Sequence, residues 1–243
     1  SKVNGTNKHM GGPTLDNRDS VGCERTDSGK PFSCVPLRWK TVPEYLQEAG
    51  ISWRVYQDKD NFGDDPLVMW KQYQTSAKKK GDLAQRGTSF PGLQKFFDDA
   101  RDGKLPEVSY IVAPMQLSEH PPYMPMDGAW IQGEVAKAVM HGKNWDSTAL
   151  IYSYDETGGW ADHVVSPYPP QSEESEWIED PYDKSNGITP IGPGFRLPFY
   201  IVSPWTSGGH VFTEHAAHES QIMFLEQWAL AHGKPFTSEE IPT

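Results

Sequence analysis

The chain alternates short apolar runs with longer amphipathic stretches, and this alternation predicts strands and helices in turn. The apolar runs are rich in β-branched and aromatic side chains, which favours buried strands, and they lie at 51–56, 108–113, 149–154 and 199–202. The amphipathic stretches have apolar residues at helical spacing and lie at 42–49, 90–100, 129–141 and 217–231. Because helices that alternate with short apolar strands cover both faces of a sheet, we predict an α/β fold with a largely parallel sheet.

Local signals mark where two of these helices begin and end. Thr41 stands three residues before Glu44, a spacing typical of a capped helix start, and Gly50 is placed to end the same helix. Gly103 is placed to end the helix of 90–100. We also expect one short helix over 66–75. In the last helix we expect four apolar side chains to face inward: Ile222, Phe224, Leu225 and Trp228.

Two long segments lack hydrophobic periodicity. Residues 1–38 are rich in Gly, Asp, Asn and Ser, which predicts a long loop or an irregular packed segment. Residues 168–194 are rich in Pro, Glu and Ser and hold few aliphatic side chains, which predicts a surface excursion that acts as a lid over a site. We expect the whole chain, 1–243, to form one catalytic domain.

The net charge of -11 argues against a nucleic-acid-binding protein, because phosphate backbones are bound by clustered Lys and Arg. The basic cluster Lys78 to Lys80 lies in a polar stretch and is expected to be solvated. No apolar run approaches the roughly 20 residues that a membrane-spanning helix needs.

Three residues near the N-terminus favour a secreted protein. Cys23 and Cys34 are separated by a polar loop of a length that suits a disulfide bond in an oxidising compartment. Asn4 begins an Asn-Gly-Thr sequence, which is an acceptor for N-glycosylation. The alternative is two unrelated thiols and a chance sequon.

The stretch 148–170 has the composition of a chemical site. Its apolar run ends at Asp155 and Glu156, and Asp162 and His163 follow within nine residues of that pair. Ligand sites in open α/β sheets form beyond the carboxyl ends of strands, so three carboxylates and an imidazole here predict a metal or acid–base site. The alternative is a polar loop whose acidic residues cap the next helix or face water.

Four motifs in order resemble the phosphoesterase family of phosphatidylcholine-type phospholipases C and related acid phosphatases. They are Gly-Pro-Thr-Leu-Asp-Asn-Arg at 12–18, Ser-Glu-His-Pro-Pro at 118–122, the stretch 148–170, and Val-Ser-Pro-Trp-Thr-Ser-Gly-Gly at 202–209. The resemblance implies an alkaline-phosphatase-like fold, a three-layer sandwich with a mostly parallel central sheet. It also implies hydrolysis of a phosphoric ester through a covalent phospho-enzyme at a metal-dependent site.

The resemblance implies that Thr14 is the nucleophile and also a metal ligand. A threonine hydroxyl needs a metal or a base to remove its proton, so the acidic pair must approach it. Asn17 and Arg18 match the same motif and either contact phosphate oxygens or hold the loop. Asp16 stands where the family has proline, which makes this turn less rigid.

Asp155 and Glu156 match the acidic metal-binding pair of the family. Asp162 and His163 match its Asp-His pair, in which we expect Asp162 to bind substrate and His163 to bind a phosphoryl oxygen or protonate the leaving group. The divalent metal is Ca, Mg, Mn or Zn, and oxygen ligands favour the harder cations among these.

Two further histidines match family positions. His120 is a second candidate proton donor, or else it only fixes its turn. His218 matches a histidine that the family flanks with Asp and Thr, whereas here Ala217 and Glu219 flank it, so a structural histidine at a helix start is the alternative. His210 and His215 have no family counterpart and are expected at the surface.

The resemblance implies a secreted phospholipase C that cleaves phosphatidylcholine-like lipids and makes transient contact with a membrane surface. The alternatives are an acid phosphatase acting on small monoesters and a non-catalytic binding protein. Family members begin with a strand that carries a Glu-Asn pair, and we expect this chain to be a fragment, a processed product or part of a nicked polypeptide. An upstream segment or a second chain would then be needed to complete metal binding.

Overall fold

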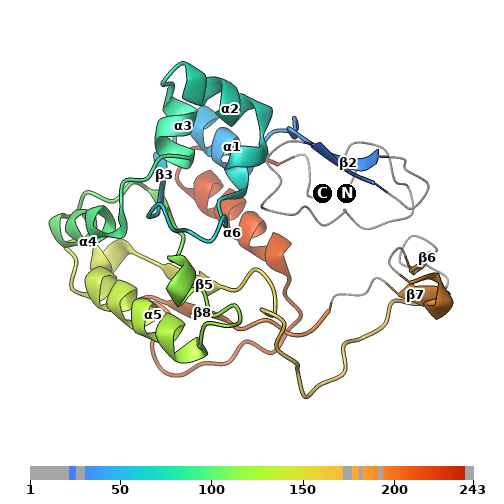
Figure 1. The fold of residues 1–243 in the computed structure, drawn as a ribbon. Helices are drawn as coiled ribbons and strands as arrows, with labels where there is room; N and C mark the ends of the chain where they lie inside the picture. The colour runs from blue at the N-terminus through green and yellow to red at the C-terminus, as the bar shows by residue number, and fades with distance from the viewer. Residues whose placement is uncertain (1–21, 26–30, 172–176, 181–182, 191–193, 239–243) are drawn as a thin grey trace. The chain divides into compact units, whose positions relative to one another are not determined.

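The computed structural model describes residues 22–25, 31–171, 177–180, 183–190 and 194–238 of the chain (Figure 1). Contacts between Cα atoms divide the chain into two compact units. Unit 1 comprises Ser1–Leu37 and Ser153–Phe199, and unit 2 comprises Arg38–Tyr152 and Tyr200–Thr243.

Unit 2 contains helices and short strands in alternation, as the hydrophobic pattern predicts. Its elements, some of which reach one residue into unit 1, are α1 (Val42–Glu48), β3 (Trp53–Tyr56), η1 (Pro66–Met69), α2 (Lys71–Lys78), α3 (Asp82–Gly87), α4 (Leu93–Asp102), β4 (Val108–Ile111), η2 (Met115–Leu117), α5 (Pro125–Met140), η3 (Trp145–Ser147), β5 (Leu150–Ser153), β8 (Phe199–Val202) and α6 (His218–Ala231). The strands form small sheets in which β3 pairs with β4 and β5 pairs with β8. The α/β class is therefore confirmed.

The sheet of β3 and β4 is parallel and is covered by helices on both faces. Its register runs from Trp53 opposite Val108 to Tyr56 opposite Ile111. Successive side chains of a strand point to opposite faces, so Val55 and Tyr56 enter different clusters. One cluster joins β3 to α1, α2 and α6, and the other joins β3 to α4 and α5. Burial on both faces is the arrangement that parallel strands require.

The predicted start of α1 is confirmed in detail. The Glu44 carboxylate accepts hydrogen bonds from the backbone N–H of Thr41 and from its hydroxyl, both at 2.9 Å. Because the Thr41 hydroxyl donates to Glu44, the buried Tyr73 hydroxyl donates to Thr41 Oγ1, at 2.9 Å. This pair of contacts ties the start of α1 to α2. At the end of α4, Gly103 adopts a left-handed conformation with φ of 71°, as the sequence predicts.

A buried polar network fixes the loop that follows β3. Gln57 is fully buried, and its side-chain amide donates to Asp65 Oδ2 at 2.7 Å while its amide oxygen accepts from Asn61 at 2.6 Å. Asp65 also accepts from the backbone N–H of Leu67 at 3.1 Å, which begins η1. Burial raises the pKa of Asp65 despite these two donors. The network therefore holds a carboxyl group inside unit 2 by hydrogen bonds.

Unit 1 contains two antiparallel pairs among its described residues. Strand β1 (Gly22–Arg25) pairs with β2 (Pro31–Val35), and β6 (Trp177–Glu179) pairs with β7 (Ile188–Pro190) after η5 (Lys184–Asn186). The backbone register of the first pair sets Cys23 opposite Cys34. The β1–β2 pair corrects the expectation of an irregular 1–38, because cross-strand pairing joins segments that show little hydrophobic periodicity.

Three other sequence expectations are wrong. The single helix expected over 66–75 is η1 followed by α2, and α3 follows as an additional helix. Strand β8 is not buried, since Phe199, Tyr200 and Ile201 are 47%, 40% and 36% exposed. Phe224 of α6 is 46% exposed instead of facing inward. An apolar run shows that a segment suits burial, but other parts of the fold decide whether it is covered.

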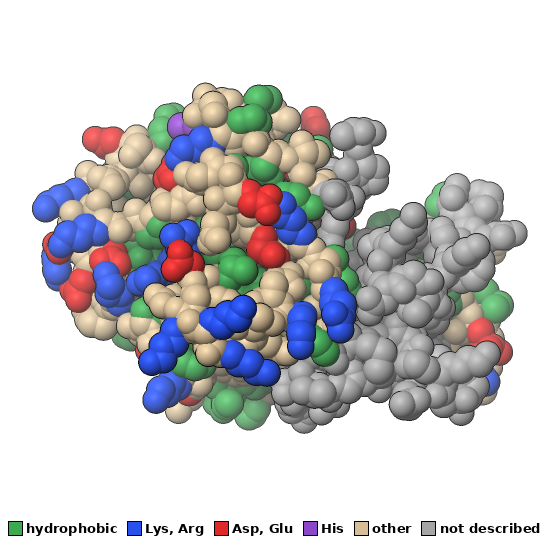
Figure 2. Space-filling model, turned by 90° about the horizontal axis from the view of Figure 1, so that it is seen from above, with side chains coloured by type: hydrophobic (Ala, Val, Ile, Leu, Met, Phe, Trp, Pro, Cys, Tyr) green, Lys and Arg blue, Asp and Glu red, His purple; other side chains and the backbone are tan. Residues whose placement is uncertain are grey.

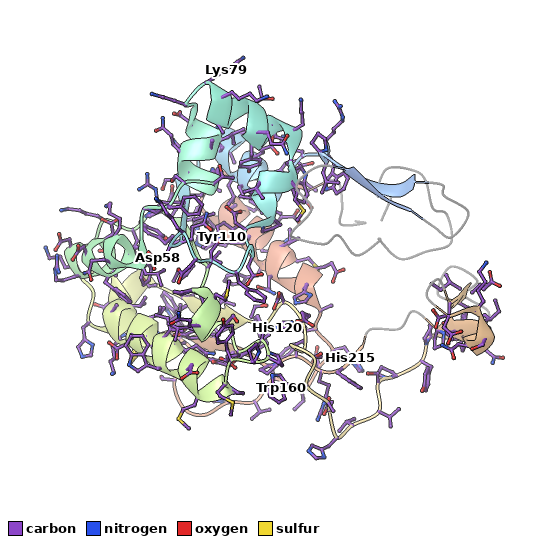
Figure 3. The ribbon with its side chains drawn as sticks, viewed as in Figure 1. Asp58, Lys79, Tyr110, His120, Trp160 and His215 are labelled. Atoms are coloured by element: carbon purple, nitrogen blue, oxygen red, sulfur yellow. The ribbon has the colours of Figure 1, made fainter. Side chains whose placement is uncertain are left out.

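Charged side chains of both signs lie on the face that Figure 2 shows, and Lys and Arg predominate in its lower part. Lys78 to Lys80 are exposed at the end of α2, and Lys79 points away from the fold in Figure 3, so the expected solvation of this cluster is confirmed. None of the helices that the structure describes is both long and apolar enough to cross a membrane.

Candidate functional site

Asp155 and Glu156 lie just beyond the end of β5, after Tyr154, where the sequence predicts a site. Both side chains are exposed. Gly158 and Gly159 come next with φ values of 63° and 81°, a left-handed conformation that glycine adopts without steric cost. These two glycines turn the chain immediately after the strand. The turn leaves both carboxylates accessible instead of continuing them into a helix.

The two carboxylates fit a divalent cation as part of a ligand set. Adjacent carboxylates at a strand end supply hard oxygen donors, which Ca and Mg prefer. Among residues 22–25, 31–171, 177–180, 183–190 and 194–238, no group of three or more His, Cys, Asp or Glu side chains is arranged to hold a metal ion. The third ligand that the sequence predicts, Thr14, lies outside the described residues, as do Asn17 and Arg18.

Asp162 is held by Arg196 in a two-pronged ion pair. Arg196 Nε lies 2.8 Å from Asp162 Oδ2, and Arg196 Nη2 lies 2.8 Å from Asp162 Oδ1. The backbone N–H groups of Arg196 and Val164 also donate to this carboxylate, each at 3.2 Å. Hydrogen bonding by Arg196 holds the pKa of Asp162 well below its ordinary value. Asp162 is therefore a carboxylate that already has donors on both of its oxygens.

His163 lies at the centre of a tight turn. The hydrogen bond from Val164 N–H to Asp162 Oδ1 spans two residues and closes an Asx turn around His163. The imidazole of His163 is exposed in this structure. The sequence brings Asp155, Glu156, Asp162 and His163 into one segment of unit 1, and the structure adds Arg196 to that set.

His120 lies in the loop between η2 and α5 of unit 2 (Figure 3). Its Nδ1 lies 2.8 Å from the carbonyl oxygen of Pro121, and because a carbonyl only accepts, Nδ1 carries a proton. Nε2 is then the ring nitrogen that is left to accept or donate a proton. The Phe62 ring packs against the imidazole with centroids 5.2 Å apart. These contacts fix the ring in one orientation.

The residue before His120 anchors its loop on α5. Glu119 adopts φ of 67°, a conformation that costs energy for a side chain of its size, and such strain clusters at functional sites. Its carboxylate accepts from Gln132 Nε2 at 2.7 Å. Gly128 permits this approach, because a Cβ there would lie 2.1 Å from Glu119 Cγ. The loop is therefore built against α5 and is not a free surface turn.

His218 is the first residue of α6, and it lines a cavity of about 520 Å³ within unit 2. Most of the lining is apolar and aromatic, including Trp39, Tyr110 and Ile222. Ala217 before it offers no side chain that could orient the imidazole, and its N–H donates to Ser220 Oγ at 3.1 Å. His210 and His215 are exposed, as expected.

Comparison with known proteins identifies the family. A model of the Phosphoesterase family matches residues 3–230. The chain belongs to the phosphoesterase family. This phosphoesterase chain is 40% identical over 205 residues to a non-hemolytic phospholipase C of Pseudomonas aeruginosa, covering 78% of this chain and 29% of that protein. It is 35% identical over 220 residues to a non-hemolytic phospholipase C of Burkholderia pseudomallei, covering 77% and 31%.

A phospholipase C B of Mycobacterium tuberculosis is 34% identical over 200 residues, covering 77% of this phosphoesterase chain and 38% of that protein. The chain therefore spans about a third of the length of these curated relatives. Family membership confirms the resemblance that the four motifs carry.

Sequence reasoning missed Arg196 as part of the site. It lies 34 residues beyond Asp162 and outside the four motifs. One weak feature of the sequence points to it. Arg196 is the one basic residue in the stretch 194–200, which leads from the surface excursion into β8. Only the fold brings this stretch beside the Asp162 turn.

Proposed function

We propose that this phosphoesterase chain belongs to a secreted phospholipase C that hydrolyses the glycerol-side ester of phosphatidylcholine-like lipids. The observation that carries the proposal is the arrangement beyond β5, where two accessible carboxylates precede an anchored histidine turn in a chain of this family. The three curated relatives described above are all named phospholipase C, which supports the lipid substrate. We expect only transient contact with a membrane surface, and no nucleic-acid partner.

The proposed reaction has two displacements at phosphorus. Thr14 Oγ attacks phosphorus, the bond to the glycerol oxygen breaks, and His163 or His120 gives that oxygen a proton. Water then attacks phospho-Thr14, and the phosphate monoester leaves while Thr14 regains its proton. Asn17 and Arg18 would stabilise charge on the phosphoryl oxygens. At His120, Nε2 would carry the transferred proton, because Nδ1 is engaged with Pro121.

A divalent ion, either Ca, Mg, Mn or Zn, would be held by Asp155, Glu156 and Thr14. When bound, it would supply positive charge that lowers the pKa of the nucleophile and neutralises the phosphoryl group. The chemistry of the described donors, two exposed carboxylates at a strand end, favours the harder cations.

The proposal extends to the architecture and the compartment. A three-layer, alkaline-phosphatase-like sandwich is supported by a parallel β3–β4 pair with helices on both faces. A Cys23–Cys34 disulfide is supported by their directly opposed positions in the backbone register, and mass measurement showing two free thiols in the secreted protein would refute it. Glycosylation at Asn4 would accompany secretion.

The experiment compares three substrates with the intact natural protein: phosphatidylcholine, a small phosphate monoester and an aryl phosphodiester. Asp155→Asn should lower both bound metal and turnover by about ten-fold or more, because the carboxylate is lost while the fold is kept. Asp146→Asn, which removes an exposed carboxylate in η3, is the matched control and should leave both unchanged.

Each outcome of this comparison has a defined meaning. Preference for the monoester would replace the phospholipase assignment with an acid phosphatase. No turnover of any substrate and no metal in the wild-type protein would indicate a non-catalytic binding protein. Unchanged metal content in Asp155→Asn would show that the metal site lies elsewhere.

A further inference from the structure

Arg196 connects two segments of unit 1 that are far apart in the sequence. The guanidinium approaches Asp162 with two parallel N–H groups, each 2.8 Å from its own carboxylate oxygen. The Asp162 side chain is 12% exposed, whereas that of Arg196 is 68% exposed. Little of the Asp162 side chain is therefore exposed to solvent, whereas most of the Arg196 side chain is. Two-pronged pairs of this kind have a fixed mutual orientation that a single contact would not impose.

The same carboxylate also organises the backbone on both sides of His163. Asp162 Oδ1 accepts from Val164 N–H, and Asp162 Oδ2 accepts from Arg196 N–H, so backbone from both segments is bound to one group. An Asx turn by itself can open, because one hydrogen bond of this type stabilises a loop only weakly. In the structure, Arg196 contacts both oxygens of the Asp162 carboxylate that closes this turn.

A second contact joins the same two segments close by. The Ser166 hydroxyl donates a hydrogen bond to the carbonyl oxygen of Gly194. Residues 162–166 and 194–196 are thus tied at two points, and the excursion between them leaves and returns at this place. Loss of either contact should alter the conformation around His163, because His163 lies within residues 162–166.

We propose that Arg196 is a positioning residue of the reaction, which holds the Asp162 carboxylate and thereby fixes the turn that presents the His163 imidazole. The inference rests on the proposed function for the role of His163 in proton transfer. It also assigns Asp162 to positioning and not to direct contact with substrate, because both of its oxygens already have donors. Arg196 acts through Asp162 and touches no reacting atom in this scheme.

The test uses the intact natural protein with Arg196→Gln, Arg196→Lys and a matched control. Arg101→Gln removes a guanidinium of similar exposure, 65%, which pairs with Asp98 and Asp102 on α4. Arg196→Gln should lower kcat about ten-fold or more on a lipid, whose alkoxide leaving group needs a proton. On an activated aryl ester the loss should stay below about three-fold. Arg101→Gln should change neither rate, since an exposed pair contributes little.

Two further readouts separate positioning from a general loss of structure. Arg196→Lys keeps the positive charge but loses the two-pronged contact with Asp162. Its rate on the lipid should therefore lie between those of Arg196→Gln and the wild-type protein. Asp162→Asn combined with Arg196→Gln should be no worse than either single variant, because both act through one contact. Additive losses, or equal losses on lipid and aryl ester, would overturn the inference.

Hydrogen exchange tests whether Arg196 stabilises the Asp162 turn, and it needs no assay of activity. In Arg196→Gln the amide of Val164 should exchange faster than in the wild-type protein, while the amides of α4 and α5 should keep their rates. An unchanged rate at Val164 would overturn the inference even if catalysis fell. A wild-type protein inactive on every ester would refute the proposed function instead, and exchange at Val164 would still decide whether Arg196 holds the His163 turn.

Discussion

At the scale of single residues, the role of His163 predicts a dependence on the leaving group. If its imidazole protonates the departing oxygen, His163→Ala should slow substrates with high-pKa leaving groups by about a hundred-fold or more. Activated aryl esters, which need no proton in the transition state, should lose much less. Steady-state rates on a series of esters with graded leaving-group pKa would measure the difference.

His215→Ala is the control for this series, because His215 is exposed in the same chain and matches no family position. Equal losses across the whole series would contradict a general acid and would indicate that His163 binds a phosphoryl oxygen instead.

The sequence predicts a residue of the site only where its neighbours along the chain form a recognisable pattern. Asp155 and Glu156 follow an apolar run and precede two glycines, so their place beyond a strand can be read from the sequence. The partner of Asp162 could not be predicted, because an ion pair across 34 residues depends on how the excursion returns. The fixed Nδ1 proton of His120 likewise depends on the conformation of its turn.

At the scale of elements, the start of α1 predicts a measurable loss of stability. Thr41→Ala would remove the hydroxyl contact with Glu44 and would leave the buried Tyr73 hydroxyl without its acceptor. Loss of a cap and an unsatisfied buried hydroxyl together should lower the free energy of unfolding by about 2 kcal/mol. Urea denaturation of the purified protein would measure this change.

Thr41→Ser should recover most of that stability, because serine keeps the hydroxyl. Thr75→Ala, at an exposed position of α2, is the control and should have little effect. A loss as large in Thr75→Ala as in Thr41→Ala would show that the contacts of Thr41 are not what stabilises α1.

Elements were predicted well where the signal is local and poorly where it is not. The capping residues of α1 and the glycine after α4 act within one turn of helix, so the sequence alone predicts where these helices begin or end. The exposure of β8 has no local signal, since an apolar strand and its covering layer are specified by different parts of a chain. The β1–β2 pair was missed because it joins residues with little hydrophobic alternation.

At the scale of the whole molecule, two partly buried tyrosines predict a loss of stability in alkali. Burial raises the pKa of Tyr110 to about 12 (Figure 3), whereas an unfolded tyrosine ionises near pH 10. The neutral ring therefore stabilises the fold fully below about pH 10, and this contribution is lost as the pH rises toward about 12. Burial likewise raises the pKa of Tyr152 to about 12.

Tyr110→Phe removes the ionisable group and keeps the ring. Its free energy of unfolding should fall less steeply between about pH 10 and 12 than that of the wild-type protein, as urea titrations at several pH values would show. Tyr168→Phe, at a tyrosine that is 68% exposed, should follow the wild-type curve. Parallel curves for wild type and Tyr110→Phe would show that Tyr110 ionises normally in the fold.

Residues 1–243 produced by themselves should associate in solution. Large apolar side chains are exposed in the loop after β8, where Trp205, Val211 and Phe212 are 67%, 82% and 72% exposed. Exposed apolar surface drives association, so this polypeptide should form dimers or larger species whose fraction rises with concentration. Light scattering coupled to gel filtration would measure the mass.

Replacing Val211 and Phe212 by serine should lower the associated fraction, whereas Phe90→Ser, at a single exposed residue before α4, should not. A monomer at every concentration would show that this loop is covered in solution.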